Sequence, residues 1–99
     1  MSQRNDLLTS ARTYAVFTSW LETDSMPTPS QLTVAIRSAI RERGGSRGCL
    51  AEVAYAYGDH PHEAASRMRW ARTAVERGFP SLDRRHTYQS IAVVEGDNT

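Results

Sequence analysis

LAEVAYAYGDHPHEAASRMRWARTAVERGF, residues 50–79, decides the fold, because it holds two helical patterns with a short break between them. In the first pattern, apolar residues recur at the spacing of one helix face: Cys49, Leu50, Val53, Ala54 and Tyr57. This pattern predicts a short helix that stops at Gly58. Asp59 or His60 can cap a second helix, which has Pro61 in its first turn and runs to about Arg77 before Gly78. The predicted inner stripe of this second helix is Ala64, Met68, Ala71 and Val75.

A third helix is predicted upstream, over about residues 28–43. Thr28 and Gln31 have the spacing of a capping box, and Pro29 takes the first helical position, where a missing N–H is harmless. Gly44 and Gly45 supply a left-handed stop, and GGSRG, residues 44–48, is expected to be a flexible turn. The predicted inner stripe is Leu32, Ile36, Ala39 and Ile40.

The N-terminal segment predicts a further helix over residues 6–22, capped by Asn5 or Asp6. Its apolar residues recur at helical spacing, at Leu7, Ala11, Tyr14, Phe17 and Leu21, with Leu8 and Trp20 broadening the stripe. This is more apolar surface than a detached arm would carry, so the helix packs on the rest of the domain or on a second copy of itself. A homodimer through this helix is therefore a candidate assembly. Residues 23–29, TDSMPTP, read as a connector.

After Pro80 the pattern becomes extended. SLDRRHTYQSIAVV, residues 81–94, has a turn-like charged centre and then a β-branched run, which predicts a short hairpin. Residues 95–99 are acidic and polar and predict a frayed tail. The fold class is therefore mainly α, with four helices and a C-terminal β-hairpin.

Size and composition indicate a single domain over residues 1–99. The chain has 99 residues, of which 39% are hydrophobic, enough for one core. Cys49 is the single cysteine, so no intramolecular disulfide can form, and a reducing compartment is expected. No stretch approaches the roughly 18 apolar residues of a membrane span, and MSQRND lacks the layout of a secretory signal. We therefore expect a cytoplasmic protein with no membrane partner.

The positive charge of the chain is concentrated in one segment, residues 67–86. Residues 1–66 carry six arginines and seven acids (−1), residues 67–86 carry six arginines and two acids (+4), and residues 87–99 carry two acids (−2). All twelve basic residues are arginine, which fits phosphate or base recognition, although a GC-rich coding sequence would produce the same bias.

The two helices of residues 50–79 have the layout of a helix-turn-helix, and the chain resembles the winged helix-turn-helix superfamily over about residues 28–94. In this resemblance Ala54 lets the two helices approach closely, Gly58 makes the turn, Val53 and Tyr57 are core positions, and Ala64 is the first buried residue after the turn. The resemblance implies that the 61–77 helix is the recognition helix and that the hairpin is a wing. Arg67, which takes a position that is often apolar, departs from the pattern.

The outer face of the 61–77 helix carries the functional prediction. His62, Ser66, Arg69 and Thr73 lie on one side at helical spacing, with Trp70 and Arg77 at the edge. Arginine can donate two hydrogen bonds to guanine, and serine and threonine can serve bases or phosphates, so Arg69 is the predicted base reader. The predicted phosphate contacts are Arg67, Arg72, Arg84 and Arg85, which His86 could join.

Each assignment has a structural alternative. Arg67 and Arg72 can pair with Glu63 and Glu76, four residues away in each case. Trp70 can be a boundary core residue, and His62 a plain surface histidine. Arg84 and Arg85 can be the solvated tip of the hairpin.

No catalytic or metal-binding signature is present in the sequence. Cys49, His60 and His62 lack the paired spacing of a zinc site, and Cys49 lies on an apolar stripe. GGSRG follows a helix and has no lysine, unlike a phosphate-binding loop. We expect no enzyme activity and no cofactor.

The sequence therefore predicts a sequence-specific protein that binds double-stranded DNA, such as a small prokaryotic or phage transcriptional regulator. The alternative is a small helical module that binds another protein, such as a phage or mobile-element adaptor or inhibitor, through the first helix or the Trp70 edge.

Overall fold

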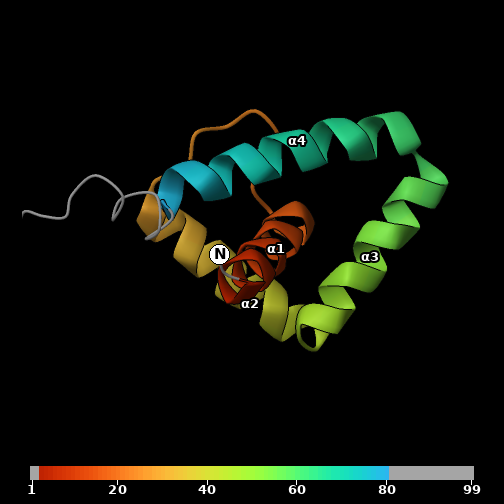
Figure 1. The fold of residues 1–99 in the computed structure, drawn as a ribbon. Coiled ribbons are helices and arrows are strands. Elements are labelled where there is room, and N and C mark those ends of the chain that lie inside the picture. The colour runs from red at the N-terminus through yellow and green to blue at the C-terminus, as the bar shows by residue number, and fades with distance from the viewer. Residues whose placement is uncertain (1–2, 81–99) are drawn as a thin grey trace, which may run out of the picture.

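A computed structural model describes residues 3–80, which form four helices (Figure 1). The helices are α1 (Gln3–Thr18), α2 (Pro29–Arg43), α3 (Ser46–Asp59) and α4 (Pro61–Gly78). The mainly α fold class is thus confirmed for these residues. The predicted hairpin at residues 81–94 and the tail at 95–99 lie outside them.

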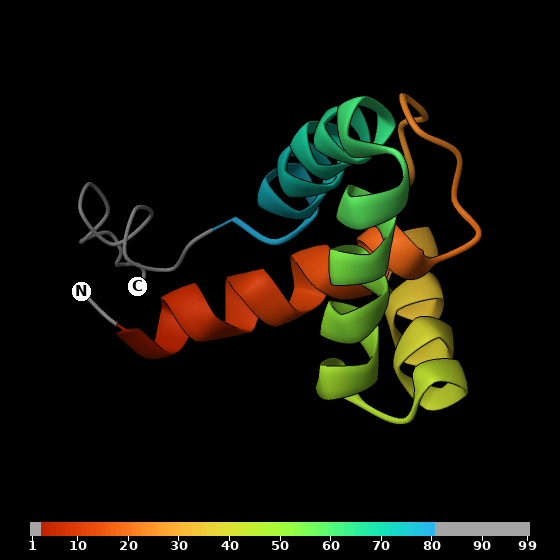
Figure 2. The same cartoon turned by 90° about the vertical axis from the view of Figure 1, so that its right-hand side faces the viewer.

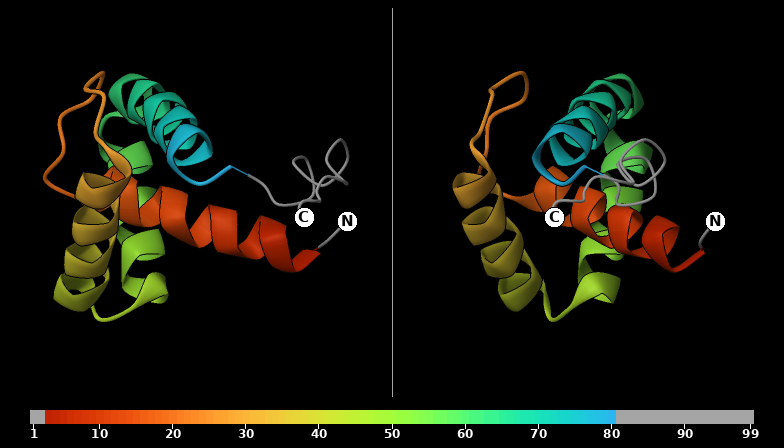
Figure 3. Two further views of the ribbon diagram at one scale, coloured as in Figure 1. Left: turned by 90° about the vertical axis from the view of Figure 1, so that its left-hand side faces the viewer. Right: turned by 60° about the vertical axis from the view of Figure 1, so that its left-hand side comes forward.

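Helix α1 is the centre of the fold. It contacts each of the other three helices, whereas α2 and α4 touch each other little (Figure 3). Ala15 and Val16, in its C-terminal half, are completely buried. The core is completed by residues from all three other helices, chiefly Leu32, Ile36, Ala39, Cys49, Val53, Ala64, Met68, Trp70, Ala71, Ala74 and Val75. The predicted packing of the first helix on the rest of the domain is confirmed for this half.

The predicted bounds and stripe of the first helix are partly wrong. The helix ends at Thr18 rather than near residue 22, because Ser19 Oγ donates to Val16 O (2.7 Å) and accepts from Leu21 N (3.2 Å). Trp20 therefore follows the helix and is 60% exposed. The N-terminal half projects from the bundle (Figure 2), and Leu7 on it is 68% exposed.

The start and end of α2 are as predicted. Gln31 N donates to Thr28 Oγ1 (3.1 Å), and Thr28 N donates to Gln31 Oε1 (2.8 Å), which completes the capping box. Gly44 ends the helix with a φ of 77°, in the left-handed region.

The turn after α2 is shorter than predicted. Only Gly44 and Gly45 separate the two helices, because α3 already begins at Ser46. Gly48, predicted to be part of a flexible turn, lies in the first turn of α3, where a Cβ atom would collide with the carbonyl of Arg43. Arg43 Nε also donates to Glu52 Oε1 (3.1 Å), which ties the end of α2 to α3.

The connection between α3 and α4 corrects two assignments of the helix-turn-helix resemblance. Gly58 lies inside α3 without a positive φ, and the single residue between the helices is His60, with φ −140° and ψ 79°. Gly58 therefore does not make the turn. Ala54 is exposed and does not mediate the helix contact.

The core positions of this pair are partly confirmed. Val53 and Ala64 are buried, as predicted. Tyr57 is 39% exposed, although its ring stacks on that of Phe17 with centroids 6.4 Å apart.

The inner face of α4 is confirmed. Ala64, Met68, Ala71 and Val75 are all at most 7% exposed. Trp70 is a core residue at the edge of this face, as the structural alternative for this residue predicted. Its side chain is 9% exposed, and its Nε1 donates to Ser25 O (2.8 Å). After α4 the chain returns to α1, where the Arg12 guanidinium lies 4.1 Å from the centre of the Phe79 ring. None of the helices in residues 3–80 combines the length and the apolarity that crossing a bilayer requires.

The two glycines of α3 give a matched test of this arrangement. Gly48→Ala should lower the free energy of unfolding by about 2 kcal/mol, because its Cβ meets backbone that cannot move aside easily. Gly58→Ala should raise it by about 0.5–1 kcal/mol, because Gly58 is helical and has open space around it. Urea denaturation of both variants measures the difference. A loss of stability in Gly58→Ala would instead support a turn role for Gly58.

Candidate functional site

Arg67 positions the helix that carries the candidate site. Its Nε donates to Phe17 O (2.6 Å), and its Nη2 donates to Ser19 O (3.0 Å) and Leu21 O (2.8 Å). Its Nη1 donates to Thr23 Oγ1 (2.8 Å). These carbonyls lie at the end of α1 and just beyond it, where helix geometry leaves acceptors without partners and the helix dipole favours a cation. One side chain of α4 therefore caps α1.

Arg67, predicted to contact phosphate, has its hydrogen-bond partners within the protein. Its guanidinium lies 4.9 Å from the centre of the Trp70 ring, and burial lowers the pKa of the side chain. Its Nε and Nη2 donate to backbone carbonyls and its Nη1 donates to the Thr23 hydroxyl, so each nitrogen of the guanidinium already has an acceptor within the protein. The alternative pairing of Arg67 with Glu63 does not occur, since the ion pairs among the side chains of residues 7–80 involve Arg43 and His60.

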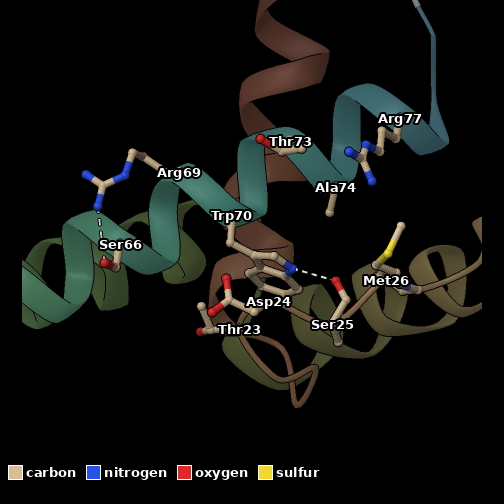
Figure 4. Close-up of a pocket in the computed structure, with 11 residues that line it drawn as sticks. Thr23, Asp24, Ser25, Met26, Ser66, Arg69, Trp70, Thr73, Ala74 and Arg77 are labelled. Atoms are coloured by element: carbon tan, nitrogen blue, oxygen red, sulfur yellow. Dashed lines mark hydrogen bonds between the residues drawn. The ribbon is translucent and has the colours of Figure 1, made fainter.

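The other predicted residues of α4 share its solvent side. His62, Ser66, Arg69, Thr73 and Arg77 are all exposed, opposite the buried stripe. Figure 4 shows four of them along one side of α4, with Arg69 Nη2 donating to Ser66 Oγ (3.2 Å). We call His62, Ser66, Arg69, Thr73 and Arg77 the outer face.

The cations on this side have no carboxylate partner within 4.0 Å among the described residues. This holds for Arg69 and Arg77, and for Arg72, which is exposed beside the outer face and does not form the alternative pair with Glu76. Unpaired guanidinium groups remain available to an anion. Glu76 is also exposed on α4, four residues after Arg72 and seven after Arg69, which is helical spacing.

The two ends of α4 differ in charge. At its N-terminal end, His60 lies between Asp59 (3.3 Å) and Glu63 (3.5 Å), so two carboxylates surround one imidazole. The arginines follow from residue 67 onward. An anionic ligand is therefore attracted more to the C-terminal two thirds of α4 than to its first turn.

A groove runs along one edge of the outer face. Residues 23–27 pass beside α4 and enclose with it a hollow of about 460 Å³, which Ser66, Arg69, Trp70, Thr73 and Arg77 line on the helix side (Figure 4). Asp24, in this loop, has a positive φ of 73°. The sequence predicted only a connector here, because the loop residues show no periodicity.

The remaining predicted positions do not add to the site. Arg84, Arg85 and His86 lie outside the described residues. Cys49 is fully buried, as its place on an apolar stripe predicted, with its Sγ 3.7 Å from Thr18 Oγ1. Among the side chains that the structure describes, residues 7–80, no three histidine, cysteine or acidic groups gather in a way that could hold a metal ion.

Comparison of the chain with protein-family models, with curated proteins and with solved structures found no match. The functional argument therefore depends on the site itself.

Arg67 and Arg72 provide a matched pair on the same helix. Arg67→Ala should lower the free energy of unfolding by about 3 kcal/mol, because it leaves several carbonyls without a donor at a largely buried helix end. Arg72→Ala should change it by about 0.5 kcal/mol or less, because its side chain is exposed and forms no ion pair with any residue that the structure describes. Equal effects in urea denaturation would contradict the capping role.

Proposed function

We propose that this chain binds double-stranded DNA in a sequence-specific manner, with the outer face of α4 in the major groove, and that it acts as a small transcriptional regulator. The observation that carries the proposal is that the arginines of α4 fall into two groups with different surroundings. Arg67 is engaged within the protein, whereas Arg69, Arg72 and Arg77 are exposed and have no acidic partner among the described residues.

The outer face suits the chemistry of the groove. A guanidinium can donate two hydrogen bonds to the O6 and N7 atoms of guanine, and Arg69 is the arginine nearest the middle of this face. Ser66 already holds the Arg69 side chain through a hydrogen bond, which limits its freedom before binding. Arg72 and Arg77 flank the face and are suited to phosphates, which position a protein on DNA.

The proposal depends on the α4 surface and not on a helix-turn-helix turn. With a single residue between α3 and α4, the pair forms a sharp corner that differs from the three- to four-residue turn of that motif. The buried stripe of α4 and the hydrogen bonds from Arg67 to the end of α1 keep the outer face exposed to solvent.

The second candidate is a protein-binding module, and one observation favours it. Leu7 and Leu8 are exposed on the projecting N-terminal half of α1, where a protein or a second copy could cover them. The Trp70 edge is a poorer contact surface, because the Trp70 side chain is buried and hydrogen-bonded.

DNA binding is tested by selecting duplexes from a random pool and measuring their affinity by fluorescence anisotropy over a range of salt concentrations. Because arginine contacts with phosphate release counterions, affinity should fall steeply as salt rises. Arg69→Ala should weaken binding to the selected duplex about tenfold and relax preference at one base pair. Arg77→Ala should lower the affinity for all duplexes alike. It should also reduce the slope of the logarithm of the binding constant against the logarithm of the salt concentration by about 1.

Arg47→Ala is the control, because Arg47 is an exposed arginine at the start of α3, away from α4 (Figure 1). It should leave affinity within about twofold of the unmodified protein. An equal loss in Arg47→Ala and Arg69→Ala would show general charge attraction and overturn the assignment to α4. The second candidate would be favoured if no duplex is selected and the chain instead binds a protein with an affinity that does not depend on salt. Leu7→Glu should then abolish this protein binding.

A further inference from the structure

The groove between residues 23–27 and α4 has the size of a small-molecule site. Its volume of about 460 Å³ falls in the usual range for such sites, roughly 300–1,000 Å³. It joins two segments distant in sequence, held together by the Trp70 hydrogen bond to Ser25 O and the Arg67 hydrogen bond to Thr23. The hollow is therefore a consequence of tertiary structure and does not depend on one flexible loop alone.

The lining of the groove combines cationic and apolar groups. Arg69 and Arg77 stand along the helix side, eight residues and therefore about 12 Å apart along the axis. Met26, which is 77% exposed, supplies apolar surface opposite them, and the largely buried Trp70 and Ala74 line the groove between them (Figure 4). A ligand that fits both kinds of surface has an anionic group and an apolar or aromatic body.

The loop side narrows the choice of ligand. Asp24 also lines the groove, so a compact cluster of negative charges would be repelled there, while a ligand with one anionic group and a hydrogen-bond donor would be accepted.

We propose that this groove binds a small organic anion with an aromatic or apolar body. Because Arg69 and Arg77 belong both to the groove and to the outer face, the bound anion competes with DNA. The ligand site stands on the groove alone, whereas the competition rests on the proposed DNA binding.

The binding test uses Trp70 as its own reporter. In the variant Trp20→Phe, which replaces an exposed side chain, Trp70 is the single tryptophan, and its fluorescence is followed during titration. The probes are adenosine monophosphate, adenosine and inorganic phosphate, which separate the anionic group from the aromatic body. Adenosine monophosphate should give a saturable change with a Kd below about 1 mM, and the other two should bind at least about tenfold more weakly.

Two arginine variants in the Trp20→Phe background locate the site. Arg77→Ala should lower the affinity for adenosine monophosphate about tenfold, because it removes a guanidinium from the groove. Arg72→Ala, on the same helix outside the groove, should leave its affinity unchanged. No saturable change with adenosine monophosphate, equal binding of phosphate alone, or equal losses in the two variants would overturn the site.

The competition is measured separately, by adding adenosine monophosphate to the protein bound to its selected duplex. Displacement of DNA that is lost in Arg77→Ala supports shared use of the arginines. Nucleotide binding without any DNA binding would refute the proposed function and the competition while leaving the ligand site in place. DNA binding without nucleotide binding would refute the ligand site alone.

Discussion

The hydrogen bonds from Arg67 to the carbonyls at the end of α1 are the interaction on which the rest of the structure depends. They join the middle of α4 to a point about fifty residues earlier in the chain, with Nε to Phe17 O at 2.6 Å. The same guanidinium reaches Ser19, Leu21 and Thr23, so it fixes both the end of α1 and the start of the following loop. Trp70, one turn further along α4, adds the hydrogen bond to Ser25.

This arrangement determines which side of α4 meets the solvent. With Arg67 and the buried stripe facing α1, the outer face has to point away from the core. A rotation of the helix by a single residue would move Arg67 away from its acceptors and turn Arg69 or Ser66 toward the core. The same contacts hold the loop beside α4 and so create the groove. The fold, the cationic surface and the hollow thus share one physical origin.

The parts that could be predicted from sequence are those fixed by neighbours in the chain. The capping box of Thr28 and Gln31 and the glycine stop of α2 involve residues within one turn, and both are confirmed. The buried stripe of α4 follows from a periodicity that tertiary packing preserves. The bounds of α3 could not be predicted well, because glycine is compatible with a turn as well as a helix, and Gly48 and Gly58 both prove helical.

Among the candidate functional side chains, too, those whose position depends on local helical spacing could be predicted, and those whose role depends on distant contacts could not. The exposure of Arg69 and Thr73 follows from helical spacing. The role of Arg67 depends on acceptors far away in sequence, and its position on a mostly apolar side was the signal that could have revealed it. The first helix was misjudged for a related reason: its apolar stripe includes Leu7, which the projecting half leaves exposed. Periodicity identifies a face but not what covers it.

The most direct test of the central claim compares Arg67 and Arg69 by NMR while duplex DNA is added. The Nε–H of Arg67 should be observable and protected from exchange with water in the free protein, because it donates to Phe17 O. Its signal should stay in place on titration, whereas the side-chain signal of Arg69 and the amides around Ser66 and Thr73 should shift. A fast-exchanging Arg67 Nε–H, or shifts confined to α1 and α3 with α4 unaffected, would contradict the account.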